Sequence, residues 1–452
     1  CCLTIFVSSL YAQRVGELLY FSSMPQATQY NPANHGNNGF YLSFPSKFHA
    51  SFNTSGFSYH DLIHQHPQYS DSLQLDFEGF AKKLKDNNYF DIDFNTSLLG
   101  FGFSVNKVNH FSFDLSLTVE SRLNFTEHLF TLLTDGTNSH EKEFSIFGDK
   151  FASATSYLAA SFGYARDINE KLTIGGSFKL YFGLLNIKSE RTDINVEFDG
   201  ETMSTISNIE INTANAFANW SMKSALDADE DGLYFDDVTN VGGNIFKNKG
   251  MGIDLGATYK INDEMTVSAS VLDLGYITWK SNTVNIHSKH PNTRVEFAGA
   301  QTQYDNMGND LEAYFEDLRD SLQYAFDLTT SDNGSYTTML PTKFYIGYSY
   351  NFLPGMYLQA LYKGRAIAGK LENSLTVAYS LRLSNLFNVS VANTFASKFF
   401  NPQILFTFND KFYFGASLAS SFDVAKMSGF NLYFGANILL FKNKKQTGKC
   451  SL

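Results

Sequence analysis

The segment 227–238 contains the residue pattern that most directly suggests a binding site. Carboxylates occur at alternate positions and are followed by a glycine, which matches the first half of the loop by which EF-hands bind calcium. The closing position holds Val238 in place of the usual glutamate, so the expected affinity is weak. The sequence predicts a weak calcium site here, and a solvated acidic loop is the alternative. The predicted ligands are Asp227, Asp229 and Asp231, the carbonyl of Leu233, and Asp236 or Asp237.

Three histidines form a second group with metal-binding side chains. His60, His64 and His66 lie close together in the sequence, beside Asp61. Imidazole nitrogens at such spacing can bind zinc or copper. No second cluster of ligands accompanies them, so polar surface residues of a loop are the expected interpretation.

Sequence signatures of catalysis are absent. The chain contains no Gly-x-Ser-x-Gly motif, no phosphate-binding loop, no Cys-x-x-Cys pair and no His-Glu-x-x-His motif. We therefore expect a protein that is not an enzyme and that requires no cofactor, with calcium in the acidic segment as the one candidate ion.

The composition indicates which kind of element must position these residues. Aromatic residues make up 16% of the 452 residues and charged residues only 17%, with 44 Phe and 25 Tyr. No run of about 20 apolar residues is present, which excludes a helical membrane protein. A net charge of −11 argues against nucleic-acid binding. An all-β protein rich in aromatic residues and poor in charge is typical of a transmembrane β-barrel.

Strict alternation of apolar residues with small or polar residues recurs along the chain. In 251–259, for example, Leu255 belongs to the apolar face and Asp254 to the polar face. The pattern predicts strands with one face toward lipid and the other toward a crowded lumen. The alternation of apolar and polar residues is interrupted at 271–275, where a β-bulge would turn an aspartate toward the lumen. The residues predicted to face the lumen are Lys179, Asp254, Thr258 and Asp273.

Short polar turns give the number of strands. Between the turns lie much longer polar segments, as in bacterial barrels with short periplasmic turns and long extracellular loops. Six turns join twelve strands, and the first and last strands bring the count to about 14. We therefore predict a single antiparallel transmembrane β-barrel over 39–441, with both termini in the periplasm. The turns are 106–110, 167–171, 261–264, 351–354, 384–385 and 409–410.

Four long outer loops, at 59–87, 124–151, 191–247 and 284–335, predict a lopsided outer end. Three of them contain apolar residues at helical spacing. Short helices there would either cap the outer mouth or only pack the loops onto the rim. The helical patterns are Phe77, Phe80, Ala81 and Leu84; Leu129, Phe130 and Leu133; and Leu311, Tyr314, Phe315, Leu318 and Leu322.

The ends of the chain differ from the barrel. Residues 1–12 are an apolar run that ends at Ala12, and we interpret them as the remainder of a signal peptide, with a first core strand as the alternative. Residues 442–452 form a short basic tail.

The segment 13–38 contains Asn31-Pro32-Ala33 just before the first predicted strand. This motif resembles the Asn-Pro-Ala segment of FadL-type transporters and the start of related Bacteroidota barrels of the PorV type. With the segments 252–260 and 271–279, the whole chain looks most like an uncharacterised Bacteroidota family of outer-membrane barrels. The resemblance implies an N-terminal hatch over 13–38 inside the barrel, anchored by Asn31, Pro32 and Ala33.

The same resemblance implies a bacterial outer-membrane location and one of two functions. FadL-like barrels passively transport small hydrophobic or amphipathic compounds. PorV-like barrels instead act as scaffolds that dock secreted or surface proteins at the outer face. Outer-membrane lipids are expected partners in both cases, and nucleic acid in neither.

Overall fold

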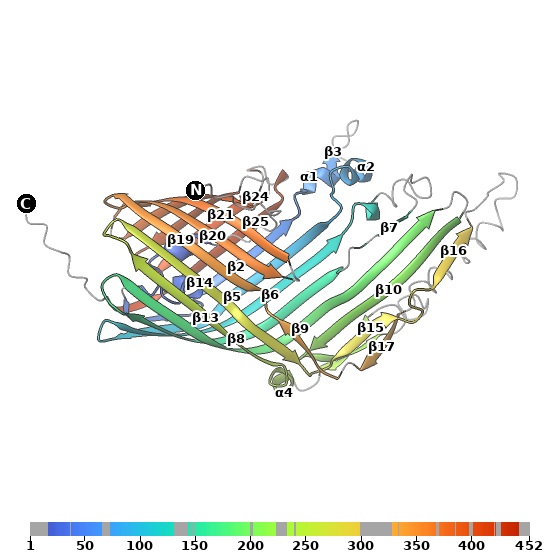
Figure 1. The fold of residues 1–452 in the computed structure, drawn as a ribbon, viewed down its shortest axis with the longest axis horizontal. Helices are drawn as coiled ribbons and strands as arrows, with labels where there is room; N and C mark the ends of the chain where they lie inside the picture. Colours follow the sequence, from blue (N-terminus) through green and yellow to red (C-terminus); the bar gives the residue numbers. More distant parts are fainter. Residues whose placement is uncertain are drawn as a thin grey trace, which may run out of the picture.

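The computed structural model describes residues 17–36, 38–65, 73–130, 143–145, 147, 150–198, 202–222, 233–238, 241–298, 328–332, 334–367, 370–384, 386–396, 401–419, 421 and 426–442. Its main element is a closed antiparallel β-barrel of 14 strands, which confirms the predicted fold class (Figure 1). No helix among the described residues is both long and apolar enough to cross a membrane.

The barrel wall consists of strands that each pair antiparallel with the next. The ring closes where β1 pairs with β26 and β2 with β25. The first position of the wall is occupied by two strands, β1 and β2, separated by 44–46. In order around the barrel the wall contains β1 (Asn38–Ser43) with β2 (Lys47–Thr54), β5 (Asn88–Val105), β6 (Asn109–Phe125), β8 (Ala152–Asp167), β9 (Leu172–Phe198), β13 (Lys249–Lys260), β14 (Met265–Trp279), β19 (Thr342–Leu353), β20 (Met356–Ile367), β21 (Lys370–Arg382), β22 (Phe387–Phe395), β23 (Pro402–Phe408), β24 (Phe412–Ala419) and β25 (Gly429–Ala436) with β26 (Ile438–Lys442).

All six predicted turns join neighbouring wall strands, and they share one end of the barrel. We call it the short-turn end. Lys442, the last described residue, pairs with Asn38 at this end, and the segment before β1 also lies here.

Additional strands extend the wall at the other end, on one side of the barrel (Figure 1). β9 continues to Phe198 and pairs with β10 (Thr202–Asn215), which pairs with β15 (Val284–Ser288) and β16 (Arg294–Ala298). The sequence analysis placed 191–198 and most of these strands in outer loops, and this prediction is wrong. The alternation of apolar and polar residues continues through 191–198, where Ile194 and Val196 are buried. The smaller strands are β7 (Glu143–Ser145), β11 (Ala218–Met222), β12 (Leu233–Val238), β17 (Leu328–Asp332) and β18 (Tyr336–Met339).

The first outer loop folds onto the rim of the barrel. It contains α1 (Tyr59–Leu62), β3 (Ile63–Gln65), β4 (Leu73–Leu75) and α2 (Phe77–Ala81), and the helix predicted near Phe80 is present. Phe57, Phe80, Leu84 and Phe125 form its core. Burial alone would raise the pKa of Asp61, but hydrogen bonds from Lys83 and Ser58 outweigh it and hold the pKa below its usual range. The helical pattern at 311–322 lies outside the described residues, and a further short helix, α4 (Val241–Ile245), precedes β13.

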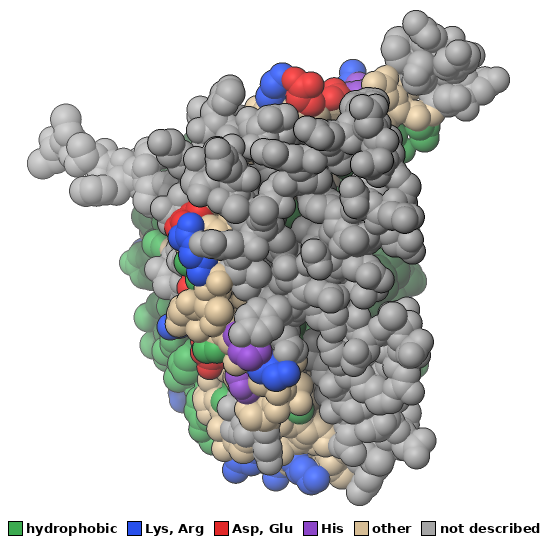
Figure 2. All heavy atoms as spheres, turned by 90° about the vertical axis from the view of Figure 1, so that its right-hand side faces the viewer, with side chains coloured by type: hydrophobic (Ala, Val, Ile, Leu, Met, Phe, Trp, Pro, Cys, Tyr) green, Lys and Arg blue, Asp and Glu red, His purple; other side chains and the backbone are tan. Residues whose placement is uncertain are grey.

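The outer surface of the wall is apolar, as alternation predicts. Leu255 is 53% exposed, whereas its neighbour Asp254 is 2% exposed and faces the lumen. In Figure 2 hydrophobic side chains lie along the left flank of the barrel, and charged side chains gather at the top and at the bottom. An apolar belt around a closed barrel is the surface that a bilayer requires. Other exposed apolar residues of the wall are Phe178, Met251, Ile253, Ile346, Phe412, Phe414, Phe434 and Leu440.

Candidate functional site in the barrel lumen

Residues 17–36, which we call the N-terminal segment, fill part of the lumen. The segment contains two short 3-10 helices, η1 (Glu17–Phe21) and η2 (Pro25–Gln29). Leu19 and Met24 pack against Tyr413 and Tyr433 on one part of the wall. Tyr20 packs against β19 and β20 on another part of the wall. Because these strands are not neighbours, the segment bridges the interior.

The motif Asn31-Pro32-Ala33 is seated on two glycines of the wall. A Cβ atom at Gly256 would lie 2.1 Å from Asn31 Oδ1, and one at Gly175 would lie 2.5 Å from the carbonyl carbon of Pro32. Asn31 is fully buried, and its Nδ2 donates to the Ala257 carbonyl at 3.3 Å. Its Oδ1 accepts from the Ala33 amide at 2.9 Å, which fixes the local turn. The motif therefore forms a close backbone contact with β9 and β13 that side chains at these glycines would prevent.

Hydrogen bonds supply most of the remaining contacts between the N-terminal segment and the wall, some between neutral groups and some to charged side chains. Tyr20 Oη donates to Ser268 Oγ at 3.0 Å. Thr258 Oγ1, at one of the positions predicted to face the lumen, donates to Asn34 Oδ1 at 2.9 Å. One ion pair joins Glu17 to Lys363 at 2.8 Å. Further bonds are Gln26 Nε2 to Asn437 Oδ1, Gln29 Nε2 to Asp114 Oδ2, Lys47 Nζ to Gln29 Oε1, and Ser270 Oγ to the Tyr30 carbonyl.

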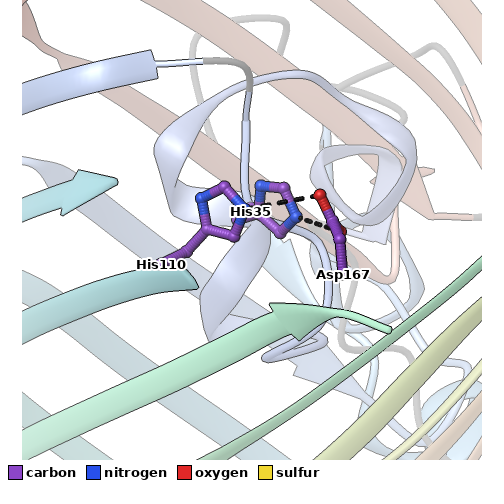
Figure 3. Close-up of side chains that lie close together, drawn as sticks. All are labelled: His35, His110 and Asp167. Carbon is purple, nitrogen blue, oxygen red and sulfur yellow. Dashed lines mark hydrogen bonds and ion pairs between the residues drawn. The ribbon is translucent and has the colours of Figure 1, made fainter. Parts of the chain in front are cut away.

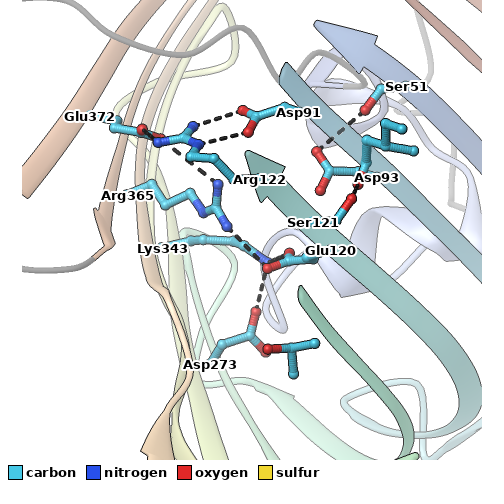
Figure 4. A network of polar contacts seen from close by, with 12 residues as sticks. Ser51, Asp91, Asp93, Glu120, Ser121, Arg122, Asp273, Lys343, Arg365 and Glu372 are labelled. Carbon is cyan, nitrogen blue, oxygen red and sulfur yellow. Dashed lines mark hydrogen bonds and ion pairs between the residues drawn. The ribbon is translucent and has the colours of Figure 1, made fainter. Parts of the chain in front are cut away.

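A continuous row of ion pairs, which we call the charged belt, crosses the lumen. Acidic and basic side chains alternate along it, so each basic group lies between two carboxylates. Figure 4 shows the part of the belt from Asp273 to Asp91. In order, the belt consists of Asp254, Lys179, Asp273, Lys343, Glu120, Arg365, Glu372, Arg122 and Asp91.

The belt joins opposite walls of the barrel. Arg122 of β6 forms two hydrogen bonds to Asp91, at 2.6 and 2.7 Å, and reaches Glu372 of β21 at 2.6 Å. Glu120, also on β6, accepts from Arg365 of β20 at 3.0 Å. β6 and β21 are separated by β8, β9, β13, β14, β19 and β20 on one side and by as many wall strands on the other. These contacts therefore span the width of the lumen.

A β-bulge positions the other end of the belt. Asp273 has φ 58°, and the register of β13 and β14 shifts at this point. Its amide donates to Asp254 Oδ1 at 2.8 Å, so two carboxylates lie side by side. Lys179 Nζ contacts both, at 2.8 Å from Asp254 and 2.6 Å from Asp273. Lys343 Nζ lies 3.0 Å from the other oxygen of Asp273. The structure thus brings together three of the four residues predicted to face the lumen.

The rest of the belt was not singled out from the sequence. A signal was available, because Glu120 and Arg122 are charged residues at alternate positions of one strand, as are Asp91 and Asp93. Charges with this spacing share one face of a strand. In a barrel that face is the lumen, since charges on the lipid face are costly.

A cavity of about 190 Å³ lies between the charged belt and the N-terminal segment. Six acidic and five basic side chains line it, among them Asp114 and Lys47 in addition to belt residues. Tyr30, Tyr41, Tyr157, Tyr181 and Tyr345 supply aromatic surface. The arrangement can bind a small molecule with both charged groups and apolar area.

The two metal-binding patterns of the outer loops have different outcomes. Asp227, Asp229 and Asp231 lie outside the described residues. Leu233, Asp236 and Asp237 lie in β12, whose backbone pairs with β11, so the calcium site stays a prediction. His60 and His64 have ring centroids 5.2 Å apart, and His64 Nε2 lies 3.5 Å from Asp76; His66 is outside the described residues.

Comparisons with known proteins place the chain in a family. No curated protein matches it. Among solved structures, the Ralstonia pickettii toluene transporter TbuX is 10% identical with TM-score 0.36, covering 92% of this chain and 94% of that one. A Pseudomonas aeruginosa FadL homologue is 10% identical with TM-score 0.40 and the same coverage. The P. putida toluene transporter TodX is 10% identical with TM-score 0.39, covering 91% and 92%. A family model described as "Family of unknown function (DUF5723)" matches residues 32–417, and the chain therefore belongs to this family.

Proposed function

We propose that the protein is a gated outer-membrane channel for small amphipathic compounds that carry charged groups. The observation that supports this most is the cavity of about 190 Å³ inside the barrel, bounded by the charged belt and by the N-terminal segment. A passive route would need the segment to move and the belt side chains to change partners. The periplasmic position of the short-turn end and the relation to Bacteroidota barrels belong to the same proposal.

Unsatisfied groups in the cavity wall indicate what a ligand would carry. Arg365 is 3% exposed and bonds Glu120 through Nη2, while its Nε and Nη1 have no hydrogen-bond partner among the described residues. A carboxylate or phosphate oxygen would accept a charge-assisted hydrogen bond from either of these N–H groups. The acidic side chains nearby would accept from an ammonium group. A zwitterion with an aromatic body therefore suits this lining.

A purely hydrophobic compound suits it less well. Such a compound would separate the charged groups from water and from one another without replacing their hydrogen bonds, which costs several kcal/mol per ion. Of the two substrate classes that the sequence suggested, hydrophobic and amphipathic, the described lumen favours the amphipathic class.

Uptake into proteoliposomes tests this function. We expect an aromatic amino acid to enter faster than an uncharged derivative of similar size, and Arg365→Gln to reduce this preference. Arg382→Gln is the matched control, because Arg382 is exposed at the end of β21. Folding of each variant is checked by the change in electrophoretic mobility on heating. Faster entry of the uncharged derivative, with Arg365→Gln equal to the wild type, would contradict the proposal.

A specific observation also favours the second candidate, docking of proteins at the outer face. The first outer loop exposes Tyr59, Leu73 and Leu75, by 57%, 70% and 54%. A protein partner would bury these side chains. If docking is the function, Leu73→Ser/Leu75→Ser should abolish co-purification of a partner and leave amino-acid uptake unchanged.

A further inference from the structure

A polar cluster separate from the charged belt joins the N-terminal segment to the rim at the short-turn end. It consists of His35 from the segment, His110 near the start of β6 and Asp167 at the end of β8. His35 Nε2 lies 3.0 Å from Asp167 Oδ1, and His110 Nε2 lies 3.6 Å from Asp167 Oδ2 (Figure 3). Three segments that are far apart in sequence thus place ligand atoms within 4.8 Å of one another.

Each member of the cluster is held in place by a further contact. His35 Nδ1 donates to the Gly36 carbonyl at 3.4 Å, and His110 Nδ1 contacts Ser104 Oγ at 2.8 Å. Thr173 Oγ1 donates to Asp167 Oδ1 at 2.6 Å. Because the Nδ1 atoms are engaged elsewhere, the Nε2 atoms are the ones presented to the carboxylate. Outer contacts of this kind orient histidines that bind metal ions.

One ligand atom of the cluster lacks a hydrogen bond. His110 is only 8% exposed, and its Nε2 has no hydrogen-bond partner among the described residues although it faces Asp167. The two rings stack with centroids 3.3 Å apart and planes 13° from parallel. The buried imidazole of His110 and the half-buried imidazole of His35 face one carboxylate and leave an uncompensated nitrogen, and a cation between the three groups would satisfy it.

We propose that His35, His110 and Asp167 bind a divalent transition-metal ion of the zinc class. Imidazole nitrogen suits such ions, whereas calcium and magnesium prefer ligands that are all oxygen. In tetrahedral geometry, metal–ligand bonds of about 2.0–2.2 Å place the ligand atoms roughly 3.3 Å apart. Here His35 Nε2 lies 3.0 Å from one carboxylate oxygen and His110 Nε2 lies 3.6 Å from the other, and the ligand atoms all lie within 4.8 Å of one another. Binding requires the stacked rings to tilt so that their nitrogen lone pairs converge.

A fourth ligand has room beside the cluster. A cavity of about 30 Å³ is lined by His35, His110 and Ser104. This volume is enough for a water molecule. The bound ion would then link the N-terminal segment to β6 and β8 and act as a latch on the segment. This inference does not depend on which compound the barrel transports.

Metal titration of the full chain, purified in detergent without an added histidine tag, tests the site. We expect one Zn²⁺ per chain by calorimetry, and Co²⁺ should give the visible absorption of a four-coordinate site. His110→Ala and Asp167→Asn should each weaken binding at least about tenfold, since loss of even an outer contact weakens a site by that factor. His60→Ala/His64→Ala, which removes two of the three histidines of the first outer loop, should leave binding unchanged.

The opposite pattern would overturn the site. Binding that survives both His110→Ala and Asp167→Asn, or that is lost in His60→Ala/His64→Ala, would place the metal ion at another site. Absence of Zn²⁺ binding to the folded wild type would reject the proposed site. Hydrogen exchange tests the latch. Zn²⁺ should slow exchange around His35 in the wild type and not in His110→Gln, and unchanged exchange in the wild type despite bound Zn²⁺ would reject the latch.

Discussion

The charged belt and the N-terminal segment occupy the same lumen but are held there by different means. The belt consists of side chains that project from opposite walls and meet as buried ion pairs, such as Arg122 with Glu372. The segment is a separate piece of backbone, held by neutral hydrogen bonds, by the close fit of Asn31 and Pro32 on Gly175 and Gly256, and by a few charged contacts such as that of Glu17 with Lys363. The strands that carry the belt are fixed by the ladder of the barrel, whereas the segment is not part of that ladder.

This difference indicates which of the two, the charged belt or the N-terminal segment, is suited to move. Buried charges depend on one another, because removal of one leaves its partners without compensation. Neutral hydrogen bonds contribute about 0.5–1.5 kcal/mol each and can be exchanged for water singly. The segment is therefore suited to be the gate, and the belt to be a brace that also selects by charge.

The largest effect is expected from breaking the belt. Arg122→Ala removes the partner of Asp91 and Glu372, both buried, and should destabilise the barrel by about 3–5 kcal/mol. Unfolding in denaturant measures this. Arg382→Ala, at the exposed end of β21, should change stability little. Equal unfolding midpoints for the two variants would mean that the belt is not a brace.

A smaller effect is expected from placing a charge on the opposite face of a belt strand. Leu255→Arg should destabilise the barrel by about 2–4 kcal/mol if Leu255 lies near the middle of the bilayer. Asp254→Asn should be tolerated for two reasons. The side-chain oxygen of the asparagine can still accept from the backbone amide of Asp273, and Lys179 keeps its ion pair with Asp273. Folding into lipid vesicles measures both. Equal tolerance of the two changes would contradict the assignment of faces.

Two adjacent glycines offer a sharper test of the gate. Gly175→Ala would place a Cβ atom against Pro32, and overpacking of this kind costs about 1–3 kcal/mol. It should displace the segment and raise conductance in planar bilayers. Gly176→Ala is the control, because its Cβ would meet only the Asp254 carbonyl oxygen at 3.3 Å and a Leu255 methyl at 3.6 Å. Identical conductance of the two variants would show that the N-terminal segment does not close the channel.

The smallest effect is expected from one neutral bond of the segment. Tyr20→Phe removes the hydroxyl that bonds Ser268 and Asn31, a loss of about 1 kcal/mol. If the segment is the gate, the ratio of open to closed channels should rise about fivefold. Tyr59→Phe, at an exposed tyrosine, should leave the ratio unchanged. An unchanged ratio in Tyr20→Phe would place the gating step elsewhere.

The sequence by itself determined the elements of the wall. Alternation such as that around Leu255 identifies strands because successive side chains of a strand point to opposite faces. The polar turns identify which strands are neighbours, and thereby the number of strands. Both signals are local, so they can be read without knowing the fold. The same pattern, followed further, would have revealed the extension of β9 through Ile194 and Val196.

Only the tertiary structure decided what meets inside the barrel. Arg122 faces Glu372, and His35 faces His110 and Asp167, across large separations in sequence. Asn31-Pro32-Ala33 stands out in the sequence through a resemblance, but nothing local indicates that Gly175 and Gly256 form its seat. The physical reason is that the sheet closes into a barrel. Which lumen residues lie opposite one another depends on the strand number, tilt and stagger of the whole barrel, and no single strand encodes these.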